Sequence, residues 1–287
     1  MPDRVYKDIV MLPPYASFLD RTSHYGVRIV SALVLLFLVL PIFVIIPLSF
    51  NKGSFLVYPL EGVSLRWYRE VFESYEWVHA LRNSVVVAPL STAIAVPLGT
   101  LAAVGLVRSN FPGRELVRSF LMLPMIVPIV IVAVAMYFFF APLGLTNNFL
   151  GLVLGHAALG APFVVVTVTA TLEGYDKNLT RAGKSLGAGP LGTFFRVTLP
   201  LILPGVVSGA LFAFATSFDE VVLTLFLAGP EQSTLPRQMF AGIRENVSPA
   251  IAAVATILIV ISISILLTLE WLRGRAQRLR VGTSAGA

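Results

Sequence analysis

Six stretches of the chain are apolar over a length that can cross a lipid bilayer. A membrane-spanning helix needs about 20 consecutive, mostly apolar residues, and each of the six stretches exceeds that length. Polar segments that carry most of the charged residues separate them. The pattern predicts an all-α integral membrane protein with six transmembrane helices, at about 27–50, 84–107, 117–141, 149–171, 202–227 and 249–272.

The first apolar stretch is predicted to be a retained helix that follows a polar N-terminal segment, 1–26. Its apolar run is too long for the core of a signal peptide, and no small-residue cleavage site follows it. Prolines within or at the ends of the spans do not argue against helices, because membrane helices tolerate such breaks where neighbouring helices or cavities satisfy the freed backbone groups. These prolines are Pro41, Pro47, Pro89, Pro97, Pro124, Pro128, Pro162 and Pro204.

Lysines and arginines are distributed unequally between the two sides of the predicted membrane. Of the 21, fifteen lie in the N-terminal segment with the adjoining Arg28, in the loops at 108–118 and 172–201, and in the C-terminal segment 273–287. Six lie in the segments 51–80 and 228–248 and at the adjoining helix end. Since loops rich in Lys and Arg stay in the cytoplasm, both termini are predicted to be cytoplasmic, and 51–80 and 228–248 periplasmic.

Composition agrees with a membrane protein and narrows the possible chemistry. Only 13% of the residues are charged and 56% are hydrophobic, whereas soluble domains carry about 25% charged residues. The absence of cysteine excludes disulfides, thiolate metal sites and a cysteine nucleophile. The net charge of +6 is accounted for by topology, so no nucleic-acid partner is expected. His24, His79 and His156 lack the spacing of a metal site, and we expect His156 to hydrogen-bond to a neighbouring helix.

The segment 180–205 contains two apparent nucleotide-binding motifs, and each lacks a feature that nucleotide binding requires. Gly183-Lys184-Ser185 resembles the end of a P-loop, but the first glycine of that motif is replaced by Asn178. The pattern G-x-G-x-x-G over 187–192 requires a strand before it and a helix after it within a βαβ unit. A loop of about 30 residues between two membrane spans has no room for that unit, so we expect this chain to bind neither ATP nor a dinucleotide.

The same segment instead favours two short helices. A helix over 176–186 would end at Gly187. A second would begin with Gly189 as N-cap and Pro190 at its first position, and would run through 194–196 until Leu199-Pro200 turns the chain into the next span. Phe194 and Phe195, with nearby basic residues, would give this loop an exposed apolar and cationic face. Such a face fits a docking surface for another protein, or a helix that lies on lipid headgroups.

The sequence of this loop resembles the cytoplasmic signature of permease subunits of binding-protein-dependent ABC importers. That signature is Glu-Ala-Ala, three residues, Gly, nine residues, Ile, one residue and Leu-Pro. Here it reads Arg181-Ala182-Gly183, Gly187, Val197 and Leu199-Pro200. The spacing, the central glycine and the final Leu-Pro are kept, whereas arginine replaces glutamate and glycine replaces the second alanine. A contact of that glutamate therefore cannot be transferred to Arg181.

The resemblance covers about 80–272 and implies a type-1 ABC importer permease fold in a bacterial inner membrane. It implies that the loop 172–201 forms coupling helices that dock into a separate dimer of ATP-binding cassette ATPases, which would bind the ATP and Mg²⁺. It also implies a second permease subunit and a periplasmic solute-binding protein, with lipid around the helices. The residues that would contact the ATPase are Arg181, Ala182, Gly183, Gly187, Ala188, Gly189, Pro190, Phe194, Val197, Leu199 and Pro200.

A second stretch, 217–259, is similar to the spermidine/putrescine-type permeases, in particular to the second permease subunit of such systems. Related importers for opines and other small cationic compounds share much of this pattern. The resemblance therefore implies an ATP-driven importer of a small cationic solute, with a polyamine as the expected substrate and an opine or another small organic solute as the alternative.

Two adjacent carboxylates, Asp219 and Glu220, lie inside the predicted fifth span. With a rise of 1.5 Å per residue, Asp219 is about 12 Å from the outer end of that span. A charge at that depth costs about 2.5–3.5 kcal/mol, so it normally faces a cavity or a partner. Carboxylates could lower the barrier for a cation. Since adjacent helical residues point about 100° apart, we expect Asp219 to face the path and Glu220 an interhelical partner. Alternatively, both cap or bridge helices at the subunit interface.

Other classes of membrane protein fit the chain less well. The motif of an intramembrane serine protease, G-x-S-G, is absent, since the segment 205–209 has one residue too many before its serine. A stand-alone secondary transporter would show paired broken helices in two related halves, and neither half of this chain repeats the other. We therefore expect a transport subunit without catalytic residues.

Overall fold

The structure is a computed structural model that describes residues 17–174, 176–245, 248–264 and 267. It divides the chain into two units, one formed by Met1–Glu70 with Val247–Ala287 and the other by Val71–Asn246. Every regular element of the described residues is a helix, and their β pairing is an isolated antiparallel bridge between Asn51 and Val63. This agrees with the predicted all-α class.

The first unit contains the long helix α2 (Phe18–Ser49), the start of α3 (Arg66–Glu73) and an apolar helix over Pro249–Ser264. Helix α2 begins nine residues before the predicted span. Trp67 organises the loop that follows α2. Its indole N–H donates to the Asn51 carbonyl at 2.9 Å and to the Gly53 carbonyl at 3.2 Å. With 4% of its surface exposed, Trp67 is a buried anchor of this loop.

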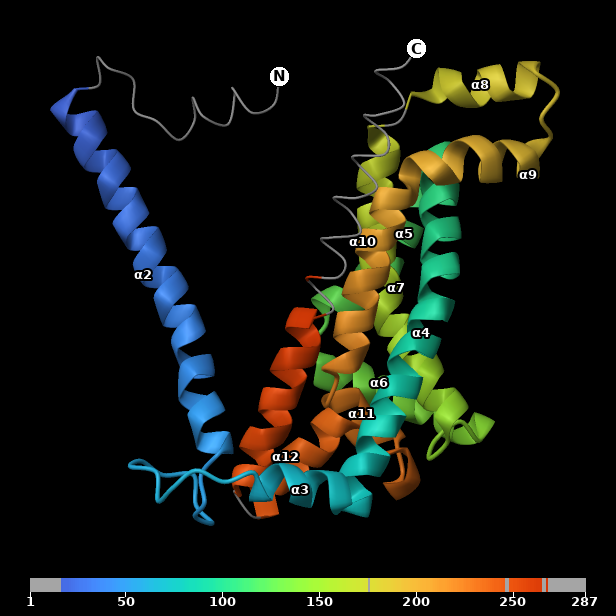
Figure 1. The fold of residues 1–287 in the computed structure, drawn as a ribbon. Coiled ribbons are helices and arrows are strands. Elements are labelled where there is room, and N and C mark those ends of the chain that lie inside the picture. Colours follow the sequence, from blue (N-terminus) through green and yellow to red (C-terminus); the bar gives the residue numbers. More distant parts are fainter. Residues whose placement is uncertain (1–16, 175, 246–247, 265–266, 268–287) are drawn as a thin grey trace. The chain divides into compact units, whose positions relative to one another are not determined.

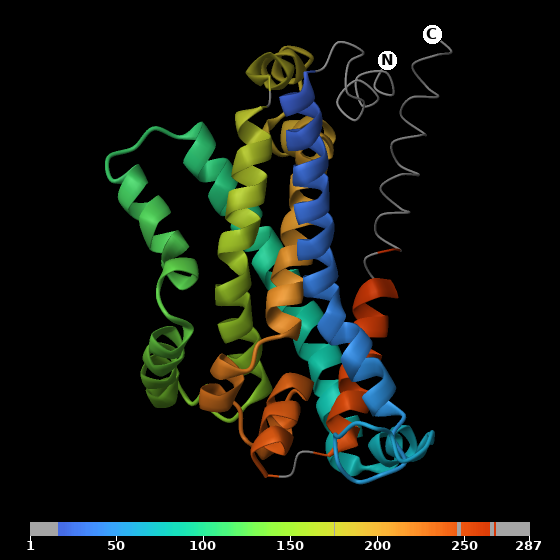
Figure 2. The same ribbon diagram turned by 90° about the vertical axis from the view of Figure 1, so that its left-hand side faces the viewer.

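Three long helices, α4 (Tyr75–Arg108), α7 (Phe149–Glu173) and α10 (Leu199–Phe218), pack side by side as the core of the second unit (Figures 1 and 2). Two of them begin at side-chain caps, since Ser74 accepts a hydrogen bond from Trp77 N and Asn148 accepts one from Gly151 N. The apolar side chains between them form a continuous buried cluster that includes Ala103, Val164, Val168, Ile202 and Ala213. These three helices correspond to predicted spans two, four and five.

Helices α7 and α10 approach each other closely because glycines face the contact. A Cβ atom on Gly205 would lie 2.2 Å from Thr171 Oγ1, and one on Gly209 would lie 2.8 Å from the Cα atom of Val164. Small residues four apart allow membrane helices to bring their backbones together. The glycines therefore set the distance between the two helices.

The predicted third span, 117–141, is not one continuous helix. Helix α5 (Arg114–Ile126) and helix α6 (Ile129–Phe140) meet at an angle of 110°. The cause is local: Pro128 has no backbone N–H, and it drives Val127 to an extended conformation with ψ of 137°. A short 3₁₀ turn, η1 (Ala141–Leu143), then leads towards α7.

The predicted fifth span, 202–227, is also interrupted. Helix α10 ends at Phe218, residues 219–221 are not helical, and helix α11 (Val222–Leu227) follows. The break coincides with the two carboxylates and gives one of them a backbone partner: Glu220 Oε1 accepts a hydrogen bond from Leu223 N at 2.8 Å, at the start of α11. A 3₁₀ turn, η3 (Pro230–Gln232), and helix α12 (Leu235–Glu245) complete this end of the unit.

Opposite ends of the second unit carry different short helices. Helices α8 (Lys177–Ser185) and α9 (Pro190–Thr193) lie across one end, and α11 and α12 lie near the other (Figures 1 and 2). A π-helical turn, η2 (Phe194–Thr198), joins α9 to α10 where the chain changes direction. Among the described residues, four helices have the length and hydropathy of membrane spans, or five if α5 and α6 count as one. Of the sixth predicted span, the structure describes the helix Pro249–Ser264 and residue 267.

Candidate functional site

The loop between α7 and α10 contains the two predicted short helices, but the second is an α-helix only over Pro190–Thr193 and continues as the π-helical turn η2. Helix α8 ends in a Schellman motif: Gly187 has φ of +84°, its N–H donates to Lys184 O at 3.0 Å, and Ala188 N donates to Gly183 O at 3.1 Å. Gly189 then precedes α9, with Pro190 at the first helical position. The turn residues anticipated from the sequence thus have the expected local roles.

The two short helices pack against each other at one glycine and leave an apolar surface exposed. A Cβ atom on Gly183 would lie 3.3 Å from Val197 Cγ2 and 3.6 Å from Thr193 Cγ2, so α8 rests directly on the following turn. The most exposed large apolar side chains of the loop are Leu186, Leu191 and Phe195. Phe194, the predicted contact residue, is half-buried. The sequence motifs did not single out the two leucines, because their exposure depends on how the loop folds.

Basic residues surround this end of the unit. Arg181, which stands where the family signature has glutamate, is exposed, as are Lys184 and Arg196. Arg108, at the end of α4, donates a hydrogen bond to Thr198 Oγ1 at 2.7 Å and lies 3.4 Å from Thr180 Oγ1 in α8. One arginine of a long helix therefore contacts both α8 and the turn before α10. This link between distant segments was not anticipated from the sequence.

The two carboxylates at the break between α10 and α11 have different surroundings. Asp219 is exposed, and its carboxylate has no hydrogen bond or ion pair within the described part of the chain. Glu220 is partly buried, and its carboxylate accepts the hydrogen bond from Leu223 N. Within the described residues, the two carboxylates therefore differ: an oxygen of Glu220 is bonded to the start of α11, whereas Asp219 is exposed.

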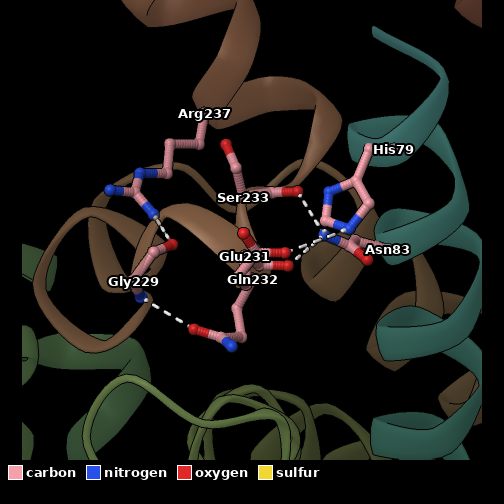
Figure 3. A network of polar contacts seen from close by, with 7 residues as sticks. All are labelled: His79, Asn83, Gly229, Glu231, Gln232, Ser233 and Arg237. Carbon is pink, nitrogen blue, oxygen red and sulfur yellow. Dashed lines mark hydrogen bonds and ion pairs between the residues drawn. The ribbon is translucent and has the colours of Figure 1, made fainter. Parts of the chain in front are cut away.

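A second polar cluster holds the segment 229–237 against the first turns of α4. Asn83, which is 4% exposed, uses its Nδ2 to donate to Glu231 O at 2.9 Å and to Ser233 O at 2.8 Å. The next residue, Ser84, accepts a hydrogen bond from Leu235 N at 2.8 Å. Figure 3 shows Asn83 directed at the two carbonyls, with the His79 ring beside it, 3.8 Å from the Glu231 carboxylate. We call residues 229–237 the cap segment.

A hydrogen-bonding side chain of the cap segment itself also stabilises it. Arg237 donates from its Nη1 to Gly229 O at 2.7 Å and to Ala228 O at 3.0 Å, as Figure 3 shows for Gly229. Burial lowers the pKa of the Arg237 guanidinium, because the charged form loses hydration. Beside it lies a cavity of about 660 Å³ whose lining includes Glu76 and Arg244, so both signs of charge border it.

The link between α4 and the cap segment makes a testable prediction. Replacing Asn83 with alanine would leave two carbonyl groups without their donor, at a cost of about 1–3 kcal/mol. We therefore expect the backbone amides of the non-proline residues in 229–238 to exchange hydrogen about tenfold faster in the variant, since local opening becomes easier. Hydrogen–deuterium exchange in lipid nanodiscs measures this. Asn110→Ala is the matched control, because Asn110 is an exposed contact of Arg114 outside the cap; equal exchange in both variants would contradict the prediction.

Histidines do not build a metal centre in the described residues, where no group of three or more His, Asp or Glu side chains converges. His156 is buried and contacts Ser217 and Thr224 on α10 and α11. This confirms the expectation that it hydrogen-bonds to neighbouring helices.

Comparisons with known proteins agree on the type of protein. Residues 95–278 match the family "Binding-protein-dependent transport system inner membrane component". "Spermidine/putrescine transport system permease protein PotC" of Haemophilus influenzae is 34% identical over 229 residues, which cover 80% of this chain and 89% of that protein. "Putrescine transport system permease protein PotI" of Escherichia coli K12 is also 34% identical, over 253 residues that cover 85% of this chain and 89% of the other.

Solved structures share the fold at low sequence identity. A chain of the bacterial alginate ABC transporter, crystallised in complex with its alginate pentasaccharide-bound periplasmic protein, superposes with a TM-score of 0.67 and 18% identity, covering 92% of this chain and 95% of that one. The helical architecture is therefore that of an ABC importer permease. With the family match spanning more than half of its residues, this chain belongs to the inner-membrane permease components of binding-protein-dependent ABC transport systems.

Proposed function

We propose that this chain is the second permease subunit of an ATP-driven importer that carries a small cationic solute, a polyamine such as spermidine or putrescine, across the bacterial inner membrane. The observation that carries the proposal is the sustained similarity to two polyamine permease proteins over at least 80% of the chain. A free carboxylate at the break in α10–α11 agrees with a cationic substrate.

The α8–α9 end of the permease is proposed to face the cytoplasm and to dock onto a dimer of ATP-binding cassette ATPases. The excess of Lys and Arg in the loop 172–201 and at both termini supports this orientation. The exposed Leu186, Leu191 and Phe195 supply apolar contact area. The contact would include Arg181, Ala182, Gly187, Ala188, Gly189, Pro190, Phe194, Val197, Leu199 and Pro200, while the buried Gly183 would hold α8 against the turn behind it.

In this arrangement the chain itself uses no catalytic residue. ATP and Mg²⁺ would be bound by the ATPase, and closure of its dimer would draw the coupling loops of two permease subunits together. Through Arg108, movement of α8 would reach α4 and the start of α10 directly. A periplasmic binding protein would deliver substrate at the opposite end, where the cap segment lies.

Asp219 is the proposed contact for the substrate, and Glu220 holds the break in shape. The difference in their partners supports this division, because of the two carboxylates only that of Glu220 accepts a hydrogen bond from the backbone of α11. At an effective dielectric constant of 20, two opposite charges 4 Å apart attract by about 4 kcal/mol, part of which is offset by desolvation of the cation. A net contribution of about 1.4 kcal/mol already corresponds to a tenfold effect on the rate.

The test is uptake of labelled spermidine and putrescine into proteoliposomes that contain the complete system, with ATP inside and binding protein outside. We expect ATP-dependent uptake that falls about tenfold in Asp219→Asn, and an assembled ATPase that still responds to binding protein. Glu115→Gln is the matched control, because it removes an exposed carboxylate of α5 far from the break in sequence.

Other outcomes lead to other functions. If neither amine moves while binding protein loaded with another solute stimulates ATP hydrolysis, the polyamine assignment is overturned in favour of an opine or another small organic solute. If the chain moves substrate without its ATPase, it is a secondary transporter.

A further inference from the structure

A chain of buried hydroxyl and imidazole groups joins four helices of the second unit. It consists of Ser91 in α4, His156 in α7, Ser217 in α10 and Thr224 in α11, each no more than 6% exposed. His156 Nδ1 lies 2.8 Å from Ser217 Oγ, and its Nε2 lies 3.1 Å from Thr224 Oγ1. Ser217 Oγ is in turn 3.1 Å from Ser91 Oγ. Buried polar groups that satisfy one another in this way favour a single arrangement of the helices that carry them.

His156 bridges the break that contains the two carboxylates. Ser217 lies two residues before Asp219, and Thr224 lies four residues after Glu220. The two ends of the break are therefore attached to one planar ring whose nitrogens have a fixed separation. Since α7 runs continuously through this region, the ring relates the end of α10 to the start of α11.

The hydroxyl groups beside the ring have further partners of their own. The Thr224 hydroxyl donates to the Glu220 carbonyl at 3.2 Å, and Ser91, which contacts Ser217, donates to Val87 O within α4. Each hydroxyl has a single hydrogen to donate. A side chain that replaces the ring must therefore reach one hydroxyl on α10 and one on α11.

Close packing beside His156 leaves little freedom for α11 to move relative to α7. A Cβ atom on Gly155 would lie 2.8 Å from Leu227 Cδ1 and 3.1 Å from Leu223 Cδ2, and both leucines are fully buried. The glycine permits close approach, while the imidazole fixes the position along the helix. Together they determine where α11 begins.

We propose that His156 is a positioning residue for transport, which holds the ends of α10 and α11 so that the break presents the Asp219 carboxylate to the substrate. The role of Asp219 in this inference rests on the proposed function, whereas the role of His156 in fixing the break does not. His156 itself acts through Ser217 and Thr224 and contacts no substrate.

Three variants each remove one of the two contacts of His156, either the one with Ser217 or the one with Thr224. The amide of asparagine can occupy the place of Nδ1 and that of glutamine the place of Nε2, so His156→Asn keeps the contact with Ser217 and His156→Gln keeps the contact with Thr224. Thr224→Val removes the second contact with little change of shape. We expect each to lower substrate uptake per ATP hydrolysed about tenfold, as a lost buried hydrogen bond would. Thr92→Val is the matched control, because the Thr92 hydroxyl donates to Ala88 O within its own helix at 2.7 Å.

A second measurement reports on the position of residue 219 independently of the substrate. The chain has no cysteine, so Asp219→Cys supplies its only thiol. The reaction of this thiol with a cationic methanethiosulfonate reagent can be followed on this subunit of the assembled complex. Each further substitution is combined with Asp219→Cys. We expect Thr224→Val and His156→Gln to change the rate of thiol labelling, and Thr92→Val to leave it unchanged.

The outcomes distinguish this inference from the proposed function. Unchanged labelling in assembled Thr224→Val and His156→Gln complexes overturns the positioning role, and so does an equal change in Thr92→Val. If labelling changes as expected but Asp219→Asn transports normally, His156 positions the break and the proposed role of Asp219 is overturned. If uptake responds and labelling does not, His156 affects transport by another route.

Discussion

Replacing Gly209 with valine is expected to prevent α10 from packing on α7, and so to remove most of the folded permease from the membrane. A Cβ atom there would lie 2.6 Å from Thr167 Oγ1 and 2.8 Å from the Cα atom of Val164. The threonine side chain can rotate, but the Cα atom belongs to the backbone of α7 and can move only if the helices separate. Overpacking of a core typically costs about 1–3 kcal/mol, and a backbone collision in the middle of the unit should exceed that range.

The measurement is the yield of monodisperse permease complex after detergent extraction, followed by thermal unfolding. Gly105→Val is the matched control: Gly105 also lies in a long helix, α4, but a Cβ atom on it would meet no heavy atom within 4 Å. We expect the control to be extracted like the native protein and Gly209→Val to aggregate or be degraded. A Gly209→Val complex with native yield and unfolding temperature would contradict the close α7–α10 contact.

The helices that contain these glycines could be predicted from the sequence, but their contact could not. Apolar runs of more than 20 residues identified α2, α4 and α7 to within nine residues at every end. The spacing of Gly205 and Gly209 is visible in the sequence as a small-residue pattern for helix packing. Which helix it faces depends on the fold, because its partner residues Thr167 and Thr171 lie in a different span.

The breaks in the spans were harder to foresee than the spans themselves. Pro128 is a local signal for the interruption between α5 and α6, yet the 110° angle depends on where the two helices pack. The break after Phe218 lacks a proline or glycine at residues 219–221. Hydropathy averages over such short interruptions, so a continuous fifth span was predicted where the structure has two helices.

In the candidate site, too, local features could be predicted from the sequence and long-range contacts could not. The end of α8 and the start of α9 were predictable because Gly187, Gly189 and Pro190 act on their own neighbours in sequence. The contacts of His156 join residues 61 and 68 positions apart, and those of Asn83 span 148 and 150 positions. No sequence spacing encodes such pairs, although an isolated polar residue within an apolar span already indicates that a partner exists.

Replacing Gly187 with valine is expected to uncouple transport from ATP hydrolysis without disturbing the membrane core. At this position a new Cβ atom would meet no heavy atom within 4 Å, so the effect comes from the backbone alone. The φ angle of +84° costs an ordinary L-residue about 1–2 kcal/mol, and a β-branched residue is a genuine outlier there. The Schellman hydrogen bonds to Lys184 and Gly183 would be lost, and α8 would no longer end where the proposed ATPase contact requires.

We expect ATP-driven uptake to fall about 30-fold or more in Gly187→Val, as a cost of at least about 2 kcal/mol implies, while the complex of permease helices remains extractable. Gly187→Asn should restore most of the uptake, because asparagine tolerates a left-handed conformation. Gly192→Ala tests the loop at a glycine without a positive φ angle, where the new Cβ atom would lie 3.9 Å from Ala188 Cβ. If valine and asparagine at position 187 had equal effects, backbone strain at the end of α8 could not be the cause. Full uptake in Gly187→Val would show that the geometry of this turn is not needed for coupling.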